Sequence, residues 1–556
     1  MSWHAWLGTG FAISALVMAV VIVQQRRSPA ATIAWLLVLS LLPIVGWLVY
    51  RFIGPLRLER KKLRRRVTRA MVEEALGTVD ALDAASPAHR GQLARVAIAA
   101  GEAPPLRGTA VALFTEGDAT YAAISAAIAA AQHHVHLEYY IWEPDETGTQ
   151  LRDQLVARAT AGVEIRVIVD GSGSSHAHGS FWAPLRAAGG RVAVFNPVRL
   201  LRVRRPRVDF RLHRKSVICD GAIGFVGGTN VTNDESVARA GDAAWRDTHL
   251  RLEGPAVRVL QRIFAEDWLY AAGEELAMDE RCFPRLGAAG GDTVQIVASG
   301  PDLATFAIHK LFFAAINQAT SRIWLTTPYF VPDDAILTAL VSAALRGVDV
   351  RILVPARGDS RLVDMAARSY FPDVIAAGAR VYEYTPRFIH AKTFVIDDDV
   401  SIVATANLDN RSFRLDFEIA AVVYGAARNA ELAAIFDADL AHACALAAPP
   451  TGFWPRLGQS AARLLSPLLA VALALFAGCA PARHFRGPPV YSLQEVRDAK
   501  RDDDMGAGRA RDGRMYGSTG RRAGDANRRR ERAAPARQAG DDGGRTQQLR
   551  PSLVLQ

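Results

Sequence analysis

The sequence predicts an α/β protein built from two homologous halves that pack face to face, preceded by a two-helix transmembrane hairpin. Short β-rich runs alternate with alanine-rich helical stretches from about residue 106, one histidine motif occurs twice at a constant offset, and two apolar runs open the chain. These patterns divide the chain into six segments: a hairpin with a basic flank at 1–70, a linker at 71–105, two halves at 106–275 and 276–445, an apolar and amphipathic segment at 446–480, and a disordered basic tail at 481–556.

The hairpin is predicted from the two apolar runs near the amino terminus. The run from about residue 6 to 23 carries no charge, and the run from about 32 to 53 is interrupted only by Arg51 near its end. Each is long enough to cross a hydrocarbon core of ~30 Å as a helix. A cleaved signal peptide is the alternative for the first run. It is disfavoured because no Lys or Arg precedes the run and a second apolar run follows at once.

The distribution of basic residues predicts the orientation of this hairpin. Its loop offers only Arg26 and Arg27, whereas residues 57–69 contain eight Lys and Arg and one Glu. The positive-inside rule therefore places the amino terminus and everything after residue 57 in the cytoplasm, with the chain a multi-pass protein of the plasma membrane. The basic cluster should lie against anionic head groups, at ~1 kcal/mol per charge.

Composition excludes several classes of protein. The 556 residues are 50% hydrophobic and 22% charged, which excludes a wholly disordered chain. The 4 cysteines are far apart and form no CxxC pair, which excludes a disulfide scaffold and a cysteine zinc site. Residues 57–69 and 480–556 each carry a net +7 of the total +10, so the rest of the chain is slightly acidic. The basic charge therefore gives no argument for a nucleic-acid partner.

The alternation of strands and helices appears in both halves. Residues 135–142 and 163–170 read as strands around a helix at 150–161. The second half repeats this order, with strands at 322–333 and 348–355 around a helix that runs through Ala344. Such alternation is typical of parallel strands with helices on both faces of the sheet. The Gly171-Ser172-Gly173 turn does not complete a dinucleotide-binding loop, because His176 stands where the third glycine would be.

Two matching clusters carry the residues suited to chemistry. His213, Lys215, Asp220 and Asn230 return as His390, Lys392, Asp397 and Asn407, each at an offset of 177 residues. Alternation along a strand places each histidine and its lysine on the same face. A lysine can hold phosphate oxygens, and a histidine beside it can attack phosphorus or donate a proton. Single His-x-Lys triplets are common by chance, but two copies in register, each with the same downstream Asp and Asn, are very unlikely to be accidental.

The repeated pattern, HxK(x)4D followed by a Gly/Ala-rich turn and Asn, resembles the phospholipase D superfamily over about residues 106–445. The amino-terminal hairpin and the stretches LEYYIWEPDETG, FVGGTNVTND, TTPYFVPDD and ATANLDNRSFRLDFE are similar to bacterial cardiolipin synthases. Two departures are visible. Ala404-Thr405 stands where Gly-Ser is usual, and Leu212 precedes the first histidine where Asn is more usual.

The resemblance implies two phospholipase D-like α/β halves whose motifs meet in one active site. It implies a metal-independent, two-step phosphatidyl transfer without a cofactor, in which one histidine becomes a phosphohistidine and the other acts as acid and base. Related enzymes more often use the amino-terminal copy, which favours His213 as nucleophile and His390 as acid and base. Lys215, Lys392, Asn230 and Asn407 would surround the phosphoryl oxygens.

Four carboxylates complete the predicted site. By resemblance, Asp247 and Glu418 hold the histidine Nδ1 atoms, and the alternative is that they are surface carboxylates at strand ends. Asp220 and Asp397 belong to the catalytic motifs, but they could equally tie the motif backbone without touching substrate. The sequence contains no cluster of carboxylates at metal spacing beside the motifs, and two lysines make a divalent cation unnecessary.

These features predict a transferase in the bacterial inner membrane that condenses two phosphatidylglycerol molecules into cardiolipin and glycerol. Its partners would be phosphatidylglycerol and other anionic membrane lipids. The alternative is a phospholipase D-type phosphodiesterase that uses water, because water and a glycerol hydroxyl attack the same intermediate. A nuclease is disfavoured by the hairpin and the acidic body.

The carboxyl-terminal region gives weaker signals. The apolar run at 464–477 is ~14 residues, which is short for a membrane span, so it could dock on the membrane or on the body. Residues 480–556 contain many Arg, Asp and Gly and few aromatic residues, which is typical of a disordered tail.

Overall fold

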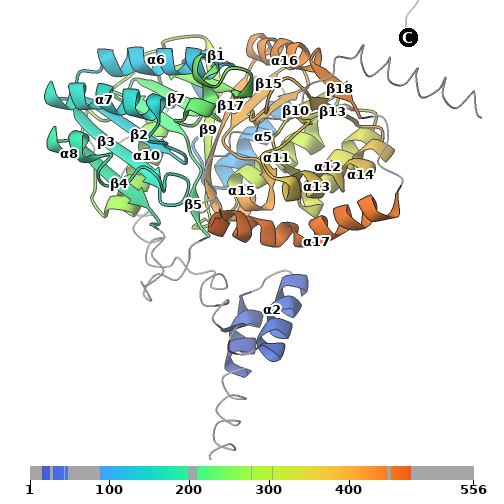
Figure 1. The fold of residues 1–556 in the computed structure, drawn as a ribbon. Coiled ribbons are helices and arrows are strands. Elements are labelled where there is room, and N and C mark those ends of the chain that lie inside the picture. Colours follow the sequence, from blue (N-terminus) through green and yellow to red (C-terminus); the bar gives the residue numbers. More distant parts are fainter. Residues whose placement is uncertain are drawn as a thin grey trace, which may run out of the picture. The chain divides into compact units, whose positions relative to one another are not determined.

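The computed structural model describes residues 16–25, 29–42, 44, 46–47, 50, 88–197, 209–276, 279–303, 305–446 and 452–476 (Figure 1). The predicted tail at 481–556 and the basic flank at 57–69 lie outside the described residues.

The amino-terminal part contains a helical stretch at 16–24 and the helix α2 (Pro29–Leu41). Ile22 and Leu39 are buried together with Tyr50, whose ring packs edge-on against Trp35 at 5.2 Å between centroids. The side-chain amide of Gln25 donates to the Tyr50 hydroxyl at 2.7 Å. The two apolar runs therefore contact each other. None of the helices in the described part of the chain is both long and apolar enough to cross a membrane.

The first half alternates strands and helices as predicted. Its main elements are β1 (Leu106–Phe114), α6 (Gly117–Ala130), β2 (His134–Tyr139), α7 (Glu146–Thr160), β3 (Glu164–Asp170), α8 (Ala183–Ala187), β4 (Arg191–Phe195), β5 (Arg211–Leu212), β6 (Ser216–Cys219), β7 (Ile223–Gly227), the short α9 (Val237–Ala240), β8 (His249–Glu253) and α10 (Ala256–Ala272).

The second half follows the same order and adds elements at its end. They are β9 (Asp292–Ser299), α11 (Ala307–Gln318), β10 (Arg322–Thr326), β11 (Phe330–Val331), α12 (Asp334–Leu345), β12 (Asp349–Pro355), α13 (Arg361–Arg368), α14 (Phe371–Ala376), β13 (Arg380–Tyr384), β14 (Thr393–Ile396), β15 (Val400–Ala404), β16 (Leu408–Asp409), α15 (Asn410–Arg414), β17 (Asp416–Tyr424), α16 (Ala426–Leu440), β18 (Ala443–Ala445) and α17 (Phe453–Phe476).

Each half has a mixed sheet, so the expectation of parallel pairing holds only for part of it. Strands β2, β3 and β4 are parallel, as are β10, β12 and β13. The strands that follow each histidine motif form antiparallel hairpins, β6–β7 and β14–β15, beside these parallel strands. The antiparallel pairing follows from the short turns at Asp220–Gly221 and Asp397–Asp398. A turn of this length reverses the chain direction, so the two strands that it joins must be antiparallel.

The halves are joined edge to edge, which corrects the expectation that they pack face to face. Strand β9 pairs with β17 of its own half and with β1 of the first half, so one sheet runs through both halves. The ladder between β1 and β9 is irregular at Gly108, whose φ is +82°. A side chain there would meet Ala288 at 2.9 Å, so glycine is required at this junction.

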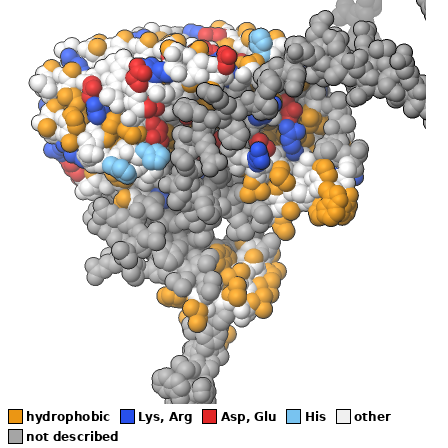
Figure 2. All heavy atoms as spheres, in the orientation of Figure 1, with side chains coloured by type: hydrophobic (Ala, Val, Ile, Leu, Met, Phe, Trp, Pro, Cys, Tyr) orange, Lys and Arg blue, Asp and Glu red, His pale blue; other side chains and the backbone are white. Residues whose placement is uncertain are grey.

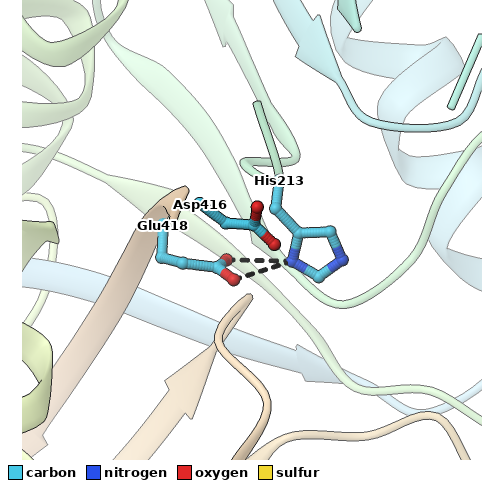
Figure 3. Close-up of side chains that lie close together, drawn as sticks. All are labelled: His213, Asp416 and Glu418. Carbon is cyan, nitrogen blue, oxygen red and sulfur yellow. Dashed lines mark hydrogen bonds and ion pairs between the residues drawn. The ribbon is translucent and has the colours of Figure 1, made fainter. Parts of the chain in front are cut away.

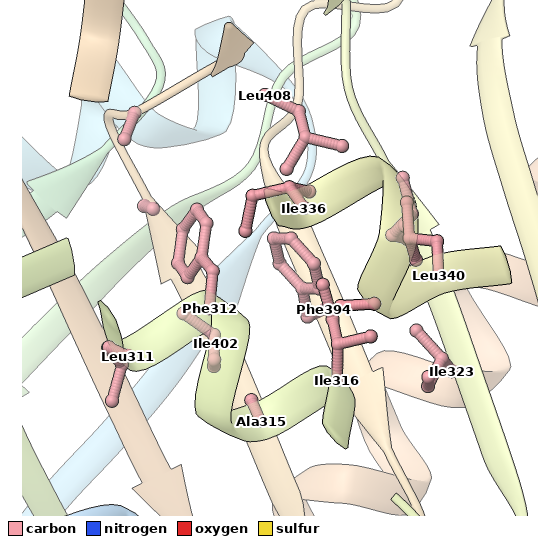
Figure 4. Close-up of a cluster of buried hydrophobic side chains, with 14 of the residues drawn as sticks. Leu311, Phe312, Ala315, Ile316, Ile323, Ile336, Leu340, Phe394, Ile402 and Leu408 are labelled. Atoms are coloured by element: carbon pink, nitrogen blue, oxygen red, sulfur yellow. The ribbon is translucent and has the colours of Figure 1, made fainter. Parts of the chain in front are cut away.

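Helices cover the faces of this sheet. In α11, the residues Ile308, Leu311, Phe312, Ala315 and Ile316 recur at helical spacing and are buried against the sheet of the second half. They pack against side chains of α12 and the sheet, and Figure 4 shows Ile336, Leu340, Phe394 and Ile402 in the same cluster.

The helix α5 (Ala88–Ala99) lies inside the segment predicted as a linker. Its Leu93, Ala94 and Ala97 join the hydrophobic core of the second half. A second core contains α10 and residues of α16, and it draws buried side chains from the strands of both halves. The segment that precedes the first half thus packs against the second half. The two halves share apolar contacts as well as a sheet.

Candidate active site

The two histidines stand directly before their hairpins, and each is bound through its backbone to the other half. The His213 N–H donates to the carbonyl of Phe417 at 2.9 Å, and the His390 N–H donates to the carbonyl of Arg246 at 2.7 Å. Phe417 and Arg246 precede Glu418 and Asp247. These two backbone hydrogen bonds therefore bring each predicted carboxylate to the histidine of the opposite half.

The carboxylates accept from the histidine rings across this junction. His213 Nδ1 lies 2.9 Å from Glu418 Oε1 and 3.0 Å from Oε2, as Figure 3 shows. His390 Nδ1 lies 2.6 Å from Asp247 Oδ2. All four side chains are buried. A carboxylate on Nδ1 places the proton there and leaves Nε2 as the nitrogen that can react.

Thr405 and Gly228, which are equivalent in the two motif copies, shape the space around these carboxylates. The Thr405 hydroxyl donates to Glu418 Oε2. At Gly228 a side chain is impossible, because its Cβ would lie 2.0 Å from Asp247 Oδ1. Thr405 therefore keeps the hydroxyl donor that the usual serine would offer to Glu418, whereas glycine at position 228 leaves room for Asp247.

The motif lysines are buried beside the histidines. Lys215 Nζ donates to the carbonyl of His213 at 2.7 Å, and Lys392 Nζ donates to the carbonyl of His390. Burial lowers the pKa of Lys215 to about 7 and that of Lys392 to about 8, and the charge of Lys392 also lowers the pKa of Lys215. Both ammonium groups can still carry charge near neutral pH, and both would gain from an anionic phosphate.

Burial also decides the charge of the two histidines. It lowers the pKa of His213, and the charges of Lys215 and Lys392 lower it further. Burial and Lys392 lower the pKa of His390 to about 3, although Asp247 opposes this shift. Burial would raise the pKa of Asp247, but Lys392 and His390 hold it below its usual range. Both imidazoles are therefore neutral at rest, as a nucleophile requires.

Asn230 and Asn407 lie three residues after the ends of β7 and β15, and both are buried. The Asn230 N–H donates to Glu235 Oε1 at 2.9 Å, and the Asn407 N–H donates to Ser412 Oγ at 3.0 Å. Asn407 Oδ1 has no hydrogen-bond partner in the described structure. Glu235 and Ser412 were missed in the sequence, although they share the offset of 177 and that signal could have identified them.

Asp220 and Asp397 tie the backbone in the hairpin turns that follow the motifs. Asp220 accepts from the N–H groups of residues 132, 133 and 134 at 2.7, 2.7 and 2.9 Å. Asp397 accepts from those of residues 320, 321 and 322. Both have a positive φ, +52° and +45°. Of the two interpretations of these residues, the hydrogen bonds favour the structural one.

We expect Asp220→Ala to destabilise the fold by about 2 kcal/mol, because several backbone N–H groups lose their acceptor and alanine tolerates a positive φ less well. Thermal unfolding of the purified chain measures this effect. The folded variant should keep its activity within a few-fold, with Asp242→Asn as an exposed control. Loss of activity without loss of stability would show that Asp220 has a catalytic role.

Two trios of side chains have the spacing of a metal site, which the sequence did not indicate. They are His213, Asp416 and Glu418 (Figure 3), and Glu235, Asp247 and His390, and the potential ligand atoms of each trio lie within 4.8 Å of one another. The expectation that no such cluster accompanies the motifs is therefore wrong as a statement about geometry. In each trio, however, the histidine Nδ1 is already hydrogen-bonded to a carboxylate, and both motif lysines place positive charge nearby.

Several residues around the histidines had not been identified from the sequence. Tyr140 lies edge-on to His213 at 4.9 Å between centroids, and Trp245 lies 5.0 Å from His390. Arg214, which separates His213 and Lys215 in the sequence, is fully buried. Its guanidinium pairs with Asp267 and donates to the carbonyl of Glu418 at 3.2 Å. It stands where the second motif has alanine. Their roles depend on contacts between distant segments, for which the sequence carries no local signal.

Comparison with known proteins identifies the family. Residues 124–268 and 312–440 match the family described as cardiolipin synthase, PLD-like domain. Residues 13–55 match the one described as phospholipase D-nuclease N-terminal. A cardiolipin synthase of Alkalihalophilus pseudofirmus is 38% identical over 479 residues, which cover 83% of this chain and 94% of the relative. The chain belongs to the cardiolipin synthase family.

Other comparisons agree with this assignment. A cardiolipin synthase of Geobacillus kaustophilus is 40% identical over 466 residues, covering 82% of this chain and 92% of the relative. Among solved structures, the phosphatidylserine synthase of Haemophilus influenzae matches with a TM-score of 0.53 at 14% identity, covering 69% of this chain and 99% of that one. The last similarity supports the fold of the two halves. The chain is thus an enzyme of the phospholipase D superfamily.

The lowered lysine pKa values predict a pH dependence for this enzyme. As pH rises through about 7 and 8, the free enzyme loses the charges of Lys215 and Lys392, so an anionic phosphate should bind less well. We expect kcat/KM to fall above about pH 8, whereas kcat should persist to higher pH because bound phosphate raises both pKa values. Initial rates across pH measure both quantities, and a constant kcat/KM up to about pH 10 would contradict the expectation.

Proposed function

We propose that this enzyme condenses two phosphatidylglycerol molecules into cardiolipin and glycerol through a phosphohistidine. The observation that carries the proposal is the exchange of carboxylates between the halves, Glu418 to His213 and Asp247 to His390. It produces two oriented imidazoles in one site, and in-line displacement at phosphorus needs a nucleophile on one side and an acid on the other. The names of the relatives support the cardiolipin product.

In the first step, Nε2 of His213 attacks the phosphorus of one phosphatidylglycerol. Binding of the anionic phosphate raises the pKa of His390, whose Nε2 then takes up a proton from solvent. The bond between phosphorus and the head-group glycerol oxygen breaks, and His390 Nε2 gives that oxygen this proton. In the second step, His390 takes the proton of a head-group hydroxyl on another phosphatidylglycerol, whose oxygen attacks phosphorus and releases His213. Lys215 and Lys392 would balance the charge on the phosphoryl oxygens, and the side-chain N–H groups of the buried Asn230 and Asn407 could donate to the same oxygens.

The assignment of His213 as nucleophile is supported by the difference between the two carboxylates. Burial raises the pKa of Glu418, whereas opposite charges hold that of Asp247 low. An ionised Asp247 stabilises an imidazolium at His390 better than a Glu418 that is more easily protonated can stabilise one at His213. His390 is therefore the better acid and base, once the charge of a bound phosphate offsets that of Lys392.

The alternative activity is hydrolysis, in which water takes the place of the second lipid. Purified protein supplied with phosphatidylglycerol alone, followed by lipid analysis, separates the two. Cardiolipin with an equal amount of glycerol is the expected result, and phosphatidic acid as the sole product would establish a hydrolase. The His390→Ala variant is the control for background turnover.

The proposed reaction uses no metal, although the two carboxylate–histidine trios could accommodate one. The same assay should therefore proceed at an unchanged rate in EDTA, since the lysines supply the positive charge. Complete loss of turnover in EDTA that a divalent cation restores would overturn this part of the proposal.

We further propose that the apolar runs form a transmembrane hairpin that holds the catalytic halves, 106–275 and 276–445, on the cytoplasmic side of the bacterial inner membrane. The match of residues 13–55 to a family amino-terminal segment and the contact between Ile22 and Leu39 support it. A membrane-impermeant thiol reagent applied to intact cells should leave Cys444, which is exposed on the folded body, unlabelled. Labelling from outside would reverse the topology.

A further inference from the structure

A surface on the second half exposes more apolar area than the fold requires. It consists of one face of α17 with the adjoining side chains of α13, and is called the α13–α17 surface below. Phe453 is 69% exposed, Trp454 77% and Leu464 80%, and Leu457, Leu362 and Met365 are exposed as well. Figure 2 shows orange side chains gathered at the lower right, where α17 lies in Figure 1.

The sequence of α17 gives this helix two apolar faces. Phe453, Leu457, Ala461 and Leu464 recur at intervals of three and four residues, so they form one exposed stripe with Trp454 beside it. The opposite face carries Gly458, Gln459 and Ala462, and the latter two are buried. An ordinary surface helix would carry polar residues on its exposed side.

The opposite face fixes α17 to the body. A Cβ on Gly458 would lie 3.0 Å from Met365 Cε of α13, so the two helices are in close contact. Arg463 donates to the carbonyl of Ser369 at 3.4 Å, pairs with Asp373 at 3.0 Å, and stacks over Tyr370 at 4.1 Å from the ring centroid. The exposed stripe is therefore held in a defined position relative to the second half.

The charges around the stripe are mainly positive. Arg456 lies between Trp454 and Leu457, and Arg357 and Arg361 lie before and at the start of α13, all three exposed. The nearby acidic groups are engaged elsewhere. Asp364 accepts from the Gly358 N–H at 3.1 Å, and Asp373 pairs with Arg463. Exposed Trp, Phe and Leu with arginines beside them are the combination that binds an anionic bilayer surface.

A series of side-chain contacts connects the active site with the α13–α17 surface. Phe388 lies 5.8 Å from His390 and 6.4 Å from Tyr329, measured between ring centroids. The Tyr329 hydroxyl donates to Asp359 at 2.5 Å, and Asp359 stands two residues before α13. From His390 the contacts therefore lead through Phe388, Tyr329 and Asp359 to the exposed side chains of α13.

We propose that the α13–α17 surface rests on the anionic phospholipid bilayer, with the side chains of the stripe inserted at the head-group boundary. It is a second membrane contact, made by the catalytic body itself and independent of the amino-terminal runs. It rests on the proposed function, because a lipid substrate enters the site from the bilayer. The contact places the bilayer at the α13 end of the contacts that lead to His390, so that a lipid head group would enter the site from that side.

Fluorescent labelling of the full chain in vesicles tests this contact without requiring turnover. Exposed Cys444, together with Cys479, is first changed to serine, and a fluorophore is attached at Trp454→Cys. The matched control is Leu345→Cys, which is 70% exposed and lies just before β12, whereas α13 follows that strand. In phosphatidylglycerol–phosphatidylcholine vesicles, spin-labelled lipid should quench the label at 454 several-fold more than the label at 345.

Equal exposure of the two labels to aqueous iodide would overturn the proposal. A dimer of the chain in detergent, seen by light scattering and disrupted by Phe453→Ser with Leu457→Ser, would also overturn it, because a second copy of the chain would then cover the surface. Each label is also measured in vesicles of phosphatidylcholine alone, where weaker quenching at 454 is expected because the arginines lose their anionic partners.

A variant separates this inference from the proposed function. Phe453→Ser with Leu457→Ser should reduce turnover of phosphatidylglycerol several-fold in vesicles but leave it unchanged in detergent micelles, where no bilayer has to be reached. An equal rate in vesicles would count against the contact. If the unmodified chain makes no cardiolipin from any preparation, the proposed function fails, while the quenching measurement still decides the membrane contact.

Discussion

Replacing His213 by alanine should abolish the covalent intermediate and reduce turnover by about 10⁴-fold or more, which corresponds to about 5.5 kcal/mol of activation free energy. His390→Ala should reduce turnover of phosphatidylglycerol to a similar extent, because nucleophile and acid act as a unit. Both side chains are buried within the interface of the halves, so each variant is first checked for an unchanged thermal unfolding midpoint. His178→Ala, at an exposed position, is the matched control.

The two variants should differ with a substrate whose leaving group needs no proton, such as a phosphatidyl ester of p-nitrophenol. His390→Ala should still form a phosphohistidine from it, and His213→Ala should form none. Mass spectrometry of the quenched protein locates the phosphoryl group. A label on His390 would reverse the two roles, and full turnover with no label on either histidine would rule out the covalent mechanism.

Asp247→Asn is expected to reduce turnover by about 10³- to 10⁴-fold, although Asp247 touches no reacting atom. An amide at this position can donate to Nδ1 and so place the ring proton on Nε2, and it no longer stabilises the imidazolium of His390. The activated ester should recover much of this loss, because protonation of its leaving group is unnecessary. Asp242→Asn serves as the exposed control.

Glu418→Gln should behave differently, although it removes the equivalent carboxylate. It acts on His213, so the activated ester should not recover its activity, and less phosphohistidine should form in single turnover. If both variants respond equally to the activated ester, the division of labour between the two carboxylates is wrong. A normal rate for Asp247→Asn would show that the 2.6 Å hydrogen bond to His390 is dispensable.

The repeated motif allowed the histidines, lysines and asparagines to be predicted because their spacing along one strand fixes which of them share a face. The partners of the histidines could be named only by resemblance, since they lie 205 and 143 residues away. No pattern along the chain indicates that each carboxylate binds the histidine of the opposite half. That exchange depends on the backbone pairing of β5 with β17 and of Arg246 with Ile389, which no local pattern encodes.

For the fold, too, the local elements could be predicted but their neighbours could not. Periodicity identified strands such as β3 and β12 and the helices between them. It could not distinguish parallel from antiparallel neighbours, and it gave no reason to place β1 beside β9. The helix α5 was overlooked because its buried residues, Leu93, Ala94 and Ala97, include only one large apolar side chain. Its burial comes from α11, more than 200 residues later in the chain.

The exchange of carboxylates makes each half an incomplete catalyst that becomes competent only through the other. A half standing alone would keep its own His and Lys but would lack the carboxylate that orients the histidine ring. Two copies of one half would have to associate, so that each copy provides its carboxylate to the histidine of the other. The present chain is equivalent to such a pair joined end to end. Local unfolding of either half would therefore inactivate both histidines together, so a partly folded chain could not hydrolyse phospholipid.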